Sequence, residues 1–377
     1  MSKKKRNVRA DFRKNRTPRA RDKNWTHEVD PEADETADLA TRQSVTGKGE
    51  MTRKRTLAGG EVFEDDAGVS VLPAIDKSAC RLGRVLRVQG LVNLVQFDDG
   101  QVRKCATRRL LKTLATDQRH VVVAGDRVWV RPEGADEGII ERVEPRRGIL
   151  SRDSRGRQHI LAANVDQILI VVSVAEPALK PHLVDRYLVA AERSGVAPII
   201  CLNKVDLVDR AELQPVIGVY CQYGYRVLQL SATRGWGIDA MRQLLAGRQS
   251  AVTGQSGVGK SSLLNAVDPQ LGLRVGEVSA ESQKGRHTTT TAELIALSAG
   301  GFVVDTPGIR QFQLWDVEPK ELAGFFRDLR PYVSQCRYPD CTHAHEDQCA
   351  VKDAVADGYL DLRRYESYLQ MLANEPA

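Results

Sequence analysis

Apolar runs and segments with helical spacing alternate between residues 165 and 305. The runs QILIVVSVA at 167–175 and APIICL at 197–202 lack polar alternation, which is typical of strands buried on both faces. The segment 183–195 has apolar positions at helical spacing, and Gly195 is a suitable stop. This alternation predicts an α/β domain with a mostly parallel sheet and ligands at the carboxyl ends of its strands.

A second pattern occupies residues 77–150, where short β-prone segments are separated by turn signals such as Asp98-Asp99-Gly100. Several short strands at close spacing predict a small barrel. An oligonucleotide-binding (OB) fold is the preferred interpretation, and an SH3-like barrel is the alternative. Basic residues suggest a nucleic-acid face on this barrel: Arg84, Arg87, Arg103, Lys104, Arg108 and Arg109.

The two ends of the chain differ from these blocks. Residues 1–75 have almost no apolar periodicity, so a poorly ordered extension is predicted. The segment 145–162 reads as a linker. Helical spacing returns at 321–333 and 361–374. These patterns predict a multidomain protein with an extension (1–75), a barrel (76–150), an α/β domain (151–314) and a helical domain (315–377).

Composition places the chain among globular proteins, with 42% hydrophobic and 28% charged residues. A membrane span needs about 18 consecutive apolar residues, and no such run is found. With no secretory signal either, a cytoplasmic protein with no membrane partner and a monomeric state is expected. The net charge is +6, and residues 3–21 are dense in Lys and Arg, which favours binding of a polyanion.

Residues 254–261, GQSGVGKS, fit the phosphate-loop pattern between an apolar strand and a helix. Glycines let backbone N–H groups approach phosphate oxygens, and the following helix adds its dipole. Lys260 is expected to reach the β- and γ-phosphates and to serve catalysis, and the Ser261 hydroxyl to ligate Mg²⁺. The expected phosphate-binding residues are Gly254, Gln255, Ser256, Gly257, Val258, Gly259, Lys260, Ser261 and Ser262.

The tetrapeptide NKVD follows the strand 197–202 and supplies Asn203, Lys204, Val205 and Asp206. An aspartate there can accept from the guanine N1–H and exocyclic amine together, which adenine cannot offer. Asn203 and Lys204 would brace and cover the base. Ser231 and Ala232, after the next strand, would support it from the other side.

DTPG at 305–308 ends another apolar strand, so Asp305 is expected to hold Mg²⁺ through water and the Gly308 N–H to sense the γ-phosphate. A threonine of GRHTTTT at 285–291 can reach the same groups; spacing does not decide which, and Thr289 is the candidate. Ile309 stands where a Ras-like enzyme carries a water-orienting glutamine. His287 is the candidate replacement, against the alternative of an exposed loop residue.

Three of the seven cysteines cluster with a histidine as Cys336-x4-Cys341-x-His343-x5-Cys349. Three thiolates and one imidazole suit tetrahedral structural zinc. His345 is an alternative ligand. A zinc ion would stabilise a small helical domain that has little core of its own. Arginines suggest RNA contact there: Arg327, Arg330, Arg337, Arg363 and Arg364.

The motifs run in the order NKVD, SAT, phosphate loop, GRHTTTT, DTPG, whereas proteins of the Ras type begin with the phosphate loop. Together they resemble the RsgA (YjeQ) family of GTPases that depend on the small ribosomal subunit. The resemblance covers about residues 77–370 and rests on this order, on 254–262, 285–290 and 305–310, and on the cluster at 336–349.

The resemblance implies an OB barrel, a permuted GTPase domain and a zinc domain that clamp the small subunit and its rRNA during late maturation. GTP turnover to GDP would then release the factor. Two other interpretations stay open from the residues alone. One is a non-catalytic RNA-binding scaffold with a vestigial nucleotide site, and the other is an ATPase of the same phosphate-loop class.

Overall fold

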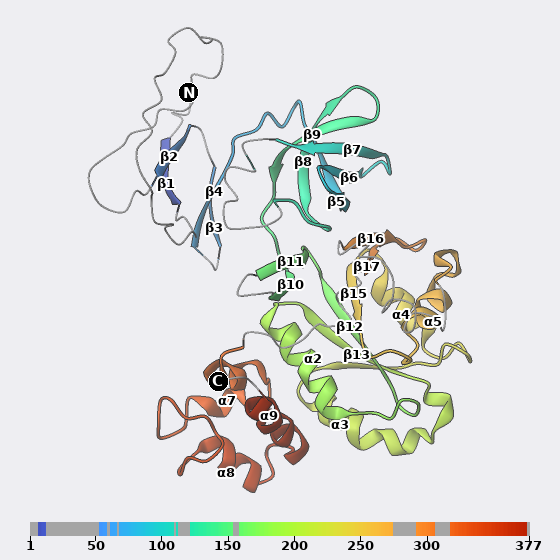
Figure 1. The fold of residues 1–377 in the computed structure, drawn as a ribbon. Helices are drawn as coiled ribbons and strands as arrows, with labels where there is room; N and C mark the ends of the chain where they lie inside the picture. Colours follow the sequence, from blue (N-terminus) through green and yellow to red (C-terminus); the bar gives the residue numbers. More distant parts are fainter. Residues whose placement is uncertain are drawn as a thin grey trace, which may run out of the picture.

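The protein is seen in a computed structural model that describes residues 7–12, 53–58, 61–65, 68–108, 111, 121–153, 158–273, 292–305 and 317–374. A β-barrel lies at one end, an α/β unit in the middle, and a helical C-terminal unit packs against the helices of the α/β unit (Figure 1). Among the described residues, no helix has both the length and the apolar character that a membrane span requires.

Five strands close the barrel in the order β5-β6-β7-β9-β8, because β5 pairs with both β6 and β8. Their side chains alternate, so Val85, Val95 and Ile140 point inward and are fully buried. The predicted OB-like barrel is therefore confirmed. The strands are β5 (Arg81–Gln89), β6 (Val92–Phe97), β7 (Val102–Thr107), β8 (Arg127–Glu133) and β9 (Glu137–Val143).

The central sheet has the order β14-β13-β12-β15-β17-β16, and all its pairs are parallel except β16 with β17. Every residue of β12 is buried, as its unbroken apolar run predicts. The predicted α/β fold is confirmed. The strands are β12 (Gln167–Ser173), β13 (Ala197–Asn203), β14 (Arg226–Gln229), β15 (Gln249–Thr253), β16 (Glu293–Ala296) and β17 (Phe302–Asp305).

Helices cover both faces of this sheet. Side chains of β12 alternate between the faces, so Leu169 packs in the cluster with α4 (Ile238–Leu245) and α5 (Lys260–Val267). Ile170 packs in the cluster with α2 (Pro181–Arg193) and α3 (Gln214–Gln222) on the other face. Short 3₁₀ turns add η1 (Val205–Leu207), η2 (Arg210–Leu213), η3 (Pro269–Leu271) and η6 (Ala323–Phe325).

The barrel joins the sheet through β5 and β16, where Arg87 is the register partner of Glu293 and pairs with it at 3.3 Å. The Arg84 guanidinium stacks 4.7 Å from the ring centre of Phe302. These two arginines, expected on a nucleic-acid face, therefore serve the contact between barrel and sheet. The predicted linker at 145–162 is also wrong in part, because β10 (Leu150–Asp153) and β11 (Gln158–Ala162) form an antiparallel hairpin.

Four strands fall within the predicted extension. Strand β1 (Asn7–Phe12) pairs with β2 (Arg53–Ala58), and β3 (Glu61–Asp65) pairs with β4 (Gly68–Leu72), both antiparallel. The sequence pattern did not predict them, since these segments carry little apolar alternation. The rest of residues 1–67 lies outside the described part of the chain.

The C-terminal unit is helical, as predicted, but the single helix expected at 321–333 is divided into α6 (Pro319–Leu322), η6 and α7 (Arg330–Val333). Gly324 has low helix propensity and Pro331 has no N–H to donate, so an interruption here costs little. Helices α8 (Ala350–Ala356) and α9 (Leu362–Asn374) complete the unit.

A buried ion cluster fixes this unit to the α/β unit. From α9, Arg364 donates through Nε and Nη2 to both carboxylate oxygens of Asp328, at 2.9 Å each, and through Nη1 to Asp185 of α2. The Tyr220 hydroxyl donates to Asp185 at 3.0 Å. Burial raises the pKa of Asp185. Arg364, expected on an RNA-binding surface, is only 2% exposed, so that expectation is wrong.

We expect Arg364→Met to destabilise the protein by about 3–5 kcal/mol, because it leaves two buried carboxylates without their cation. Urea unfolding followed through the aromatic residues of the C-terminal unit measures the effect. The matched control is Arg363→Met, whose partly exposed pair with Asp361 should contribute about 0–1 kcal/mol. Equal losses in the two variants would contradict this role for Arg364.

Candidate nucleotide site and metal centre

The carboxyl ends of five parallel strands meet at one edge of the central sheet. In register, Ser173 at the end of β12 lies beside Asn203 at the end of β13, and Thr253 of β15 lies beside Ile170 of β12. The strand order reverses between β12 and β15, since the chain runs outward from β12 to β14 and then returns. Crevices at such reversals are the usual ligand sites of open α/β sheets.

The phosphate loop follows β15 at this reversal. Gly254 has a φ of 140°, and a Cβ placed there would lie 2.0 Å from the Val171 carbonyl oxygen of β12. Only glycine fits so close to a neighbouring strand. Lys260 begins α5, and its ammonium donates to the carbonyl oxygens of Gly254 (2.8 Å) and Gln255 (2.6 Å). The loop therefore curls around this lysine.

Asn203 connects the phosphate loop to β13. Its Nδ2 donates to the Val258 carbonyl oxygen at 2.8 Å, and the side chain is 2% exposed. The loop approaches so closely that a Cβ on Gly259 would lie 2.4 Å from the same Nδ2. The Oδ1 atom of Asn203 is buried and has no hydrogen-bond partner among the described residues.

Asp206 lies in η1, where the chain leaves β13. Its Oδ2 accepts from the Thr233 hydroxyl at 3.3 Å, while its Oδ1 is buried without a partner in the described chain. Hydrogen bonding by Ser231, and more weakly by Thr233, holds the pKa of Asp206 below its ordinary value. The carboxylate is therefore ionised near neutral pH and can accept hydrogen bonds from a ligand.

Lys204 takes the left-handed conformation, with a φ of 64°, and its ammonium donates to the Glu176 carbonyl oxygen. Glu176 lies in the loop after β12. Sequence reasoning missed it, and no signal could have found it, because any residue type supplies a backbone carbonyl. Lys204 thus bridges the loops that follow β12 and β13.

The structure brings most of the predicted nucleotide residues to one edge: Asn203, Lys204, Val205, Asp206, Ser231, Ala232 and the loop 254–262. Asp305 is the last residue of β17, which neighbours β15 at the same edge. His287, Thr289, Gly308 and Ile309 lie outside the described residues.

Four ligand atoms converge in the C-terminal unit, from Cys336, Cys341, His343 and Cys349, all within 4.8 Å of one another. The His343 Nδ1 lies 3.3 Å from the Cys336 sulfur and 3.5 Å from the Cys349 sulfur, and the two sulfurs are 3.8 Å apart. A tetrahedral zinc with ordinary bond lengths separates two sulfurs by about 3.8 Å and a sulfur from a nitrogen by about 3.6 Å. The donor set therefore fits a tetrahedral metal.

A surrounding layer of hydrogen bonds shapes the ligand loop. His343 has a φ of 59°, and its carbonyl oxygen accepts from the Tyr365 hydroxyl at 2.7 Å. The Glu346 carboxylate accepts from the Thr342 N–H and hydroxyl, at 2.7 and 2.6 Å. Burial alone would raise the pKa of Glu346, yet these bonds hold it well below the ordinary range. The His345 side chain is 81% exposed, which favours His343 as the ligand.

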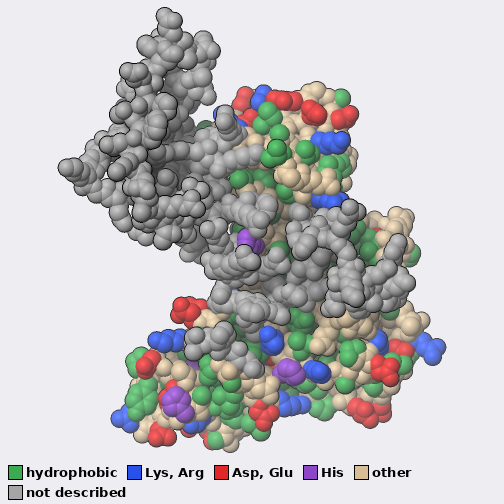
Figure 2. Space-filling model, viewed as in Figure 1, with side chains coloured by type: hydrophobic (Ala, Val, Ile, Leu, Met, Phe, Trp, Pro, Cys, Tyr) green, Lys and Arg blue, Asp and Glu red, His purple; other side chains and the backbone are tan. Residues whose placement is uncertain are grey.

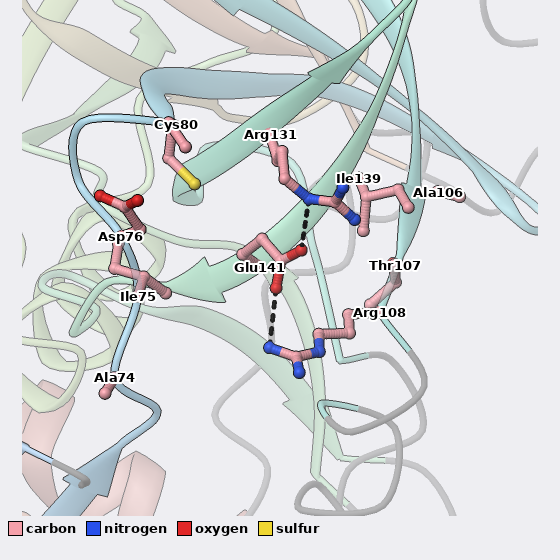
Figure 3. A pocket seen from close by; sticks show the side chains of 11 residues that line it. Ala74, Ile75, Asp76, Cys80, Ala106, Thr107, Arg108, Arg131, Ile139 and Glu141 are labelled. Atoms are coloured by element: carbon pink, nitrogen blue, oxygen red, sulfur yellow. Dashed lines mark hydrogen bonds and ion pairs between the residues drawn. The ribbon is translucent and has the colours of Figure 1, made fainter. Parts of the chain in front are cut away.

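A separate cavity of about 570 Å³ lies between residues 74–80 and the strands β7, β8 and β9 of the barrel (Figure 3). Glu141 points into it and accepts from Arg108 at 2.8 Å and from Arg131 at 3.0 Å. Both carboxylate oxygens are therefore paired. Arg108, expected on a nucleic-acid face, is 45% exposed while it pairs with Glu141. On the face seen in Figure 2, basic and acidic side chains are intermixed rather than gathered by sign.

The strand order, the glycine loop around Lys260 and the neighbouring Asn203 and Asp206 define a P-loop GTPase with circularly permuted motifs. Residues 143–315 match the RsgA GTPase family model. A "Small ribosomal subunit biogenesis GTPase RsgA" from Chromohalobacter salexigens is 42% identical over 304 residues, covering 79% of this chain and 87% of that protein. The chain belongs to the RsgA GTPase family.

Other relatives agree. The protein of the same name from Thermotoga petrophila is 39% identical over 296 residues, which cover 76% of this chain and 96% of the relative. The crystal structure of YjeQ from Thermotoga maritima aligns with a TM-score of 0.65 at 34% identity, over 78% of this chain and 98% of that one. YloQ, described as a circularly permuted GTPase, aligns with a TM-score of 0.64 at 29% identity, over 81% and 100% of the two chains.

We expect Cys349→Ser to lower the metal content of the purified protein from about one equivalent to near zero, because three donors hold zinc much less tightly than four. Elemental analysis and thermal unfolding measure the loss, and a strong chelator should lower the melting temperature of the parent protein in the same way. Cys221→Ser, at an exposed cysteine outside the cluster, is the control. Full metal retention by Cys349→Ser would contradict the assignment.

Proposed function

We propose that this protein binds and hydrolyses GTP at the carboxyl edge of its central sheet and acts in the biogenesis of the small ribosomal subunit. The observation that carries the nucleotide part is a pair of buried oxygens, Asn203 Oδ1 and Asp206 Oδ1, without described partners beside the phosphate loop. Buried polar atoms rarely stay unpaired, so a ligand that carries N–H donors fits here.

Guanine supplies those donors. In this proposal the Asp206 carboxylate accepts from the guanine N1–H and the exocyclic amine. Adenine carries neither donor at these positions, which disfavours the ATPase alternative. Asn203 and Lys204 brace the base through the contacts described above, and the turn that begins at Ser231 and Ala232 supports it from the other side.

The phosphates belong to the loop 254–262. Lys260 would exchange its two backbone carbonyl partners for the β- and γ-phosphates, and backbone N–H groups of the loop would meet the remaining oxygens. The Ser261 hydroxyl would hold Mg²⁺, with Asp305 acting through water, and the ion would neutralise charge on the phosphates. Thr289 and Gly308 lie outside the described residues and, in this proposal, would contact the γ-phosphate and Mg²⁺.

The group that positions the attacking water is a further part of the proposal. Ile309 has no polar side-chain atom, so the glutamine role of Ras-like enzymes must be filled elsewhere. His287 is the candidate within the chain. A group supplied by the ribosomal subunit is the other source, and it would make hydrolysis depend on that partner.

The ribosomal role rests on the relatives, which are named small ribosomal subunit biogenesis GTPases. We propose that the protein works in the cytoplasm as a monomer, binds the rRNA of the small subunit late in maturation, and leaves on GTP turnover. Its units would be 76–150, 151–314 and 315–377, with 1–75 as an extension and zinc as the structural metal. A vestigial scaffold is disfavoured because Lys260, Ser261, Asp305 and Asp206 are all present.

We expect Asp206→Asn to weaken GDP binding by about ten- to a hundredfold, the cost of losing a charge-assisted hydrogen bond. Xanthosine diphosphate should bind more tightly than it does to the parent, because the asparagine amide can donate to the xanthine 2-carbonyl. Equilibrium titration with fluorescent analogues of both nucleotides measures the switch. Asp209→Asn, at the exposed N-cap of η2, is the control. Unchanged preference for guanine in Asp206→Asn would refute this role.

We expect slow intrinsic GTP hydrolysis that rises strongly when purified small subunits are added. Lys260→Ala should abolish both rates, because it removes the cation that stabilises charge on the transferred phosphate. Phosphate release assays measure the rates, and Lys320→Ala, at an exposed lysine of α6, is the control. A parent rate that does not respond to subunits would contradict the ribosomal part alone, whereas full turnover by Lys260→Ala would contradict the nucleotide site.

A further inference from the structure

An exposed cation–π pair joins the two segments that lead away from the guanine motifs. The Arg210 guanidinium carbon lies 4.1 Å from the ring centre of Trp236, and Trp236 is 43% exposed. Arg210 begins η2, four residues after Asp206. Trp236 ends the tight turn that begins at Ser231. The contact therefore connects the segment carrying the carboxylate with the turn that hydrogen-bonds to it.

A backbone hydrogen bond closes the turn from Ser231 to Trp236. The Ser231 N–H donates to the Trp236 carbonyl oxygen at 3.0 Å. Gly237 has a φ of 73°, and a Cβ there would lie 2.4 Å from the Gln229 carbonyl oxygen of β14. The position of the Trp236 backbone is thus tied to the position of Ser231.

Side chains of the same turn hold Asp206. The Thr233 hydroxyl donates to Asp206 Oδ2 at 3.3 Å and lies 3.1 Å from the Ser231 hydroxyl. The Thr233 hydrogen bond is long, so it orients the carboxylate only weakly. The stacked guanidinium adds a second tie on the solvent side, at a distance where the attraction between a cation and an aromatic face is favourable.

We propose that Arg210 and Trp236 are positioning residues that set how well the protein discriminates purines by their exocyclic 2-amino group. This inference rests on the proposed function, in which Asp206 meets the guanine N1–H and amine at once. Two simultaneous hydrogen bonds require a fixed carboxylate orientation. The phosphate loop follows β15 and does not contain either residue, so the pair should affect base recognition and leave catalysis at saturating GTP unchanged.

The test compares guanosine and inosine diphosphates, because inosine keeps N1–H and lacks the 2-amino group. We expect Trp236→Leu and Arg210→Met each to weaken GDP binding by about two- to fivefold, the range of an exposed cation–π pair. Binding of inosine diphosphate should change little. The dissociation constant for inosine diphosphate divided by that for GDP should therefore fall. The kcat for GTP should hold while KM rises.

Conservative variants separate positioning from folding. Trp236→Phe and Arg210→Lys retain a ring and a cation and should restore most of the discrimination. The double variant Trp236→Leu/Arg210→Met should bind GDP no more weakly than either single variant, because each substitution already removes the contact. Glu212→Gln, at an exposed residue of the same 3₁₀ turn, is the control and should bind both diphosphates as the parent does.

Equal losses for both diphosphates would overturn the inference, because the pair would then serve only the stability of the turn. The inference would also be overturned if the variants bound both diphosphates as tightly as the parent does. A parent protein that does not prefer GDP to ADP would instead refute the proposed function. A parent that prefers GDP and discriminates against inosine, together with variants that do so equally well, would refute the pair alone.

Discussion

One side-chain amide holds the nucleotide edge together: the Asn203 Nδ2 donates to the Val258 carbonyl oxygen across 55 positions of sequence. The bond is buried, so water does not compete for it, and it ties the end of β13 to the phosphate loop after β15. It requires glycine at 259, where a Cβ would meet the same amide nitrogen. The NKVD segment and the phosphate loop therefore lie side by side despite their permuted order, since a parallel sheet aligns strand ends irrespective of connectivity.

The other units are fixed to this sheet by charged side chains. Arg364 of α9 reaches Asp185 of α2 across the interface with the C-terminal unit, and Arg84 of β5 stacks on Phe302 of β17. The segment after β17 leads directly into the C-terminal unit. The Arg364 cluster holds that unit against α2.

The candidate metal centre lies in the C-terminal unit. The C-terminal helices are short, and their shared core includes Cys349 beside Phe326 and Tyr368. Tyr365 and Tyr368 donate to backbone oxygens of His343 and Thr342, so α9 both shapes the ligand loop and carries Arg364. The shape of the ligand loop and the docking on the GTPase unit thus depend on the same helix. Loss of the metal is expected to loosen the interface as well as the loop.

The sequence by itself determined the features that depend on local spacing. Buried strands follow from unbroken apolar runs, the phosphate loop from its glycines and lysine, and the four candidate metal ligands from their separation within one short segment. Only the tertiary structure decided which charges are buried, because Arg364 finds partners 36 and 179 positions away, where no spacing rule applies. The same holds for the stacking of Arg84 on Phe302 and for the hairpin β10–β11, whose residues Leu150 and Ala162 are buried in a cluster with β12 and β15.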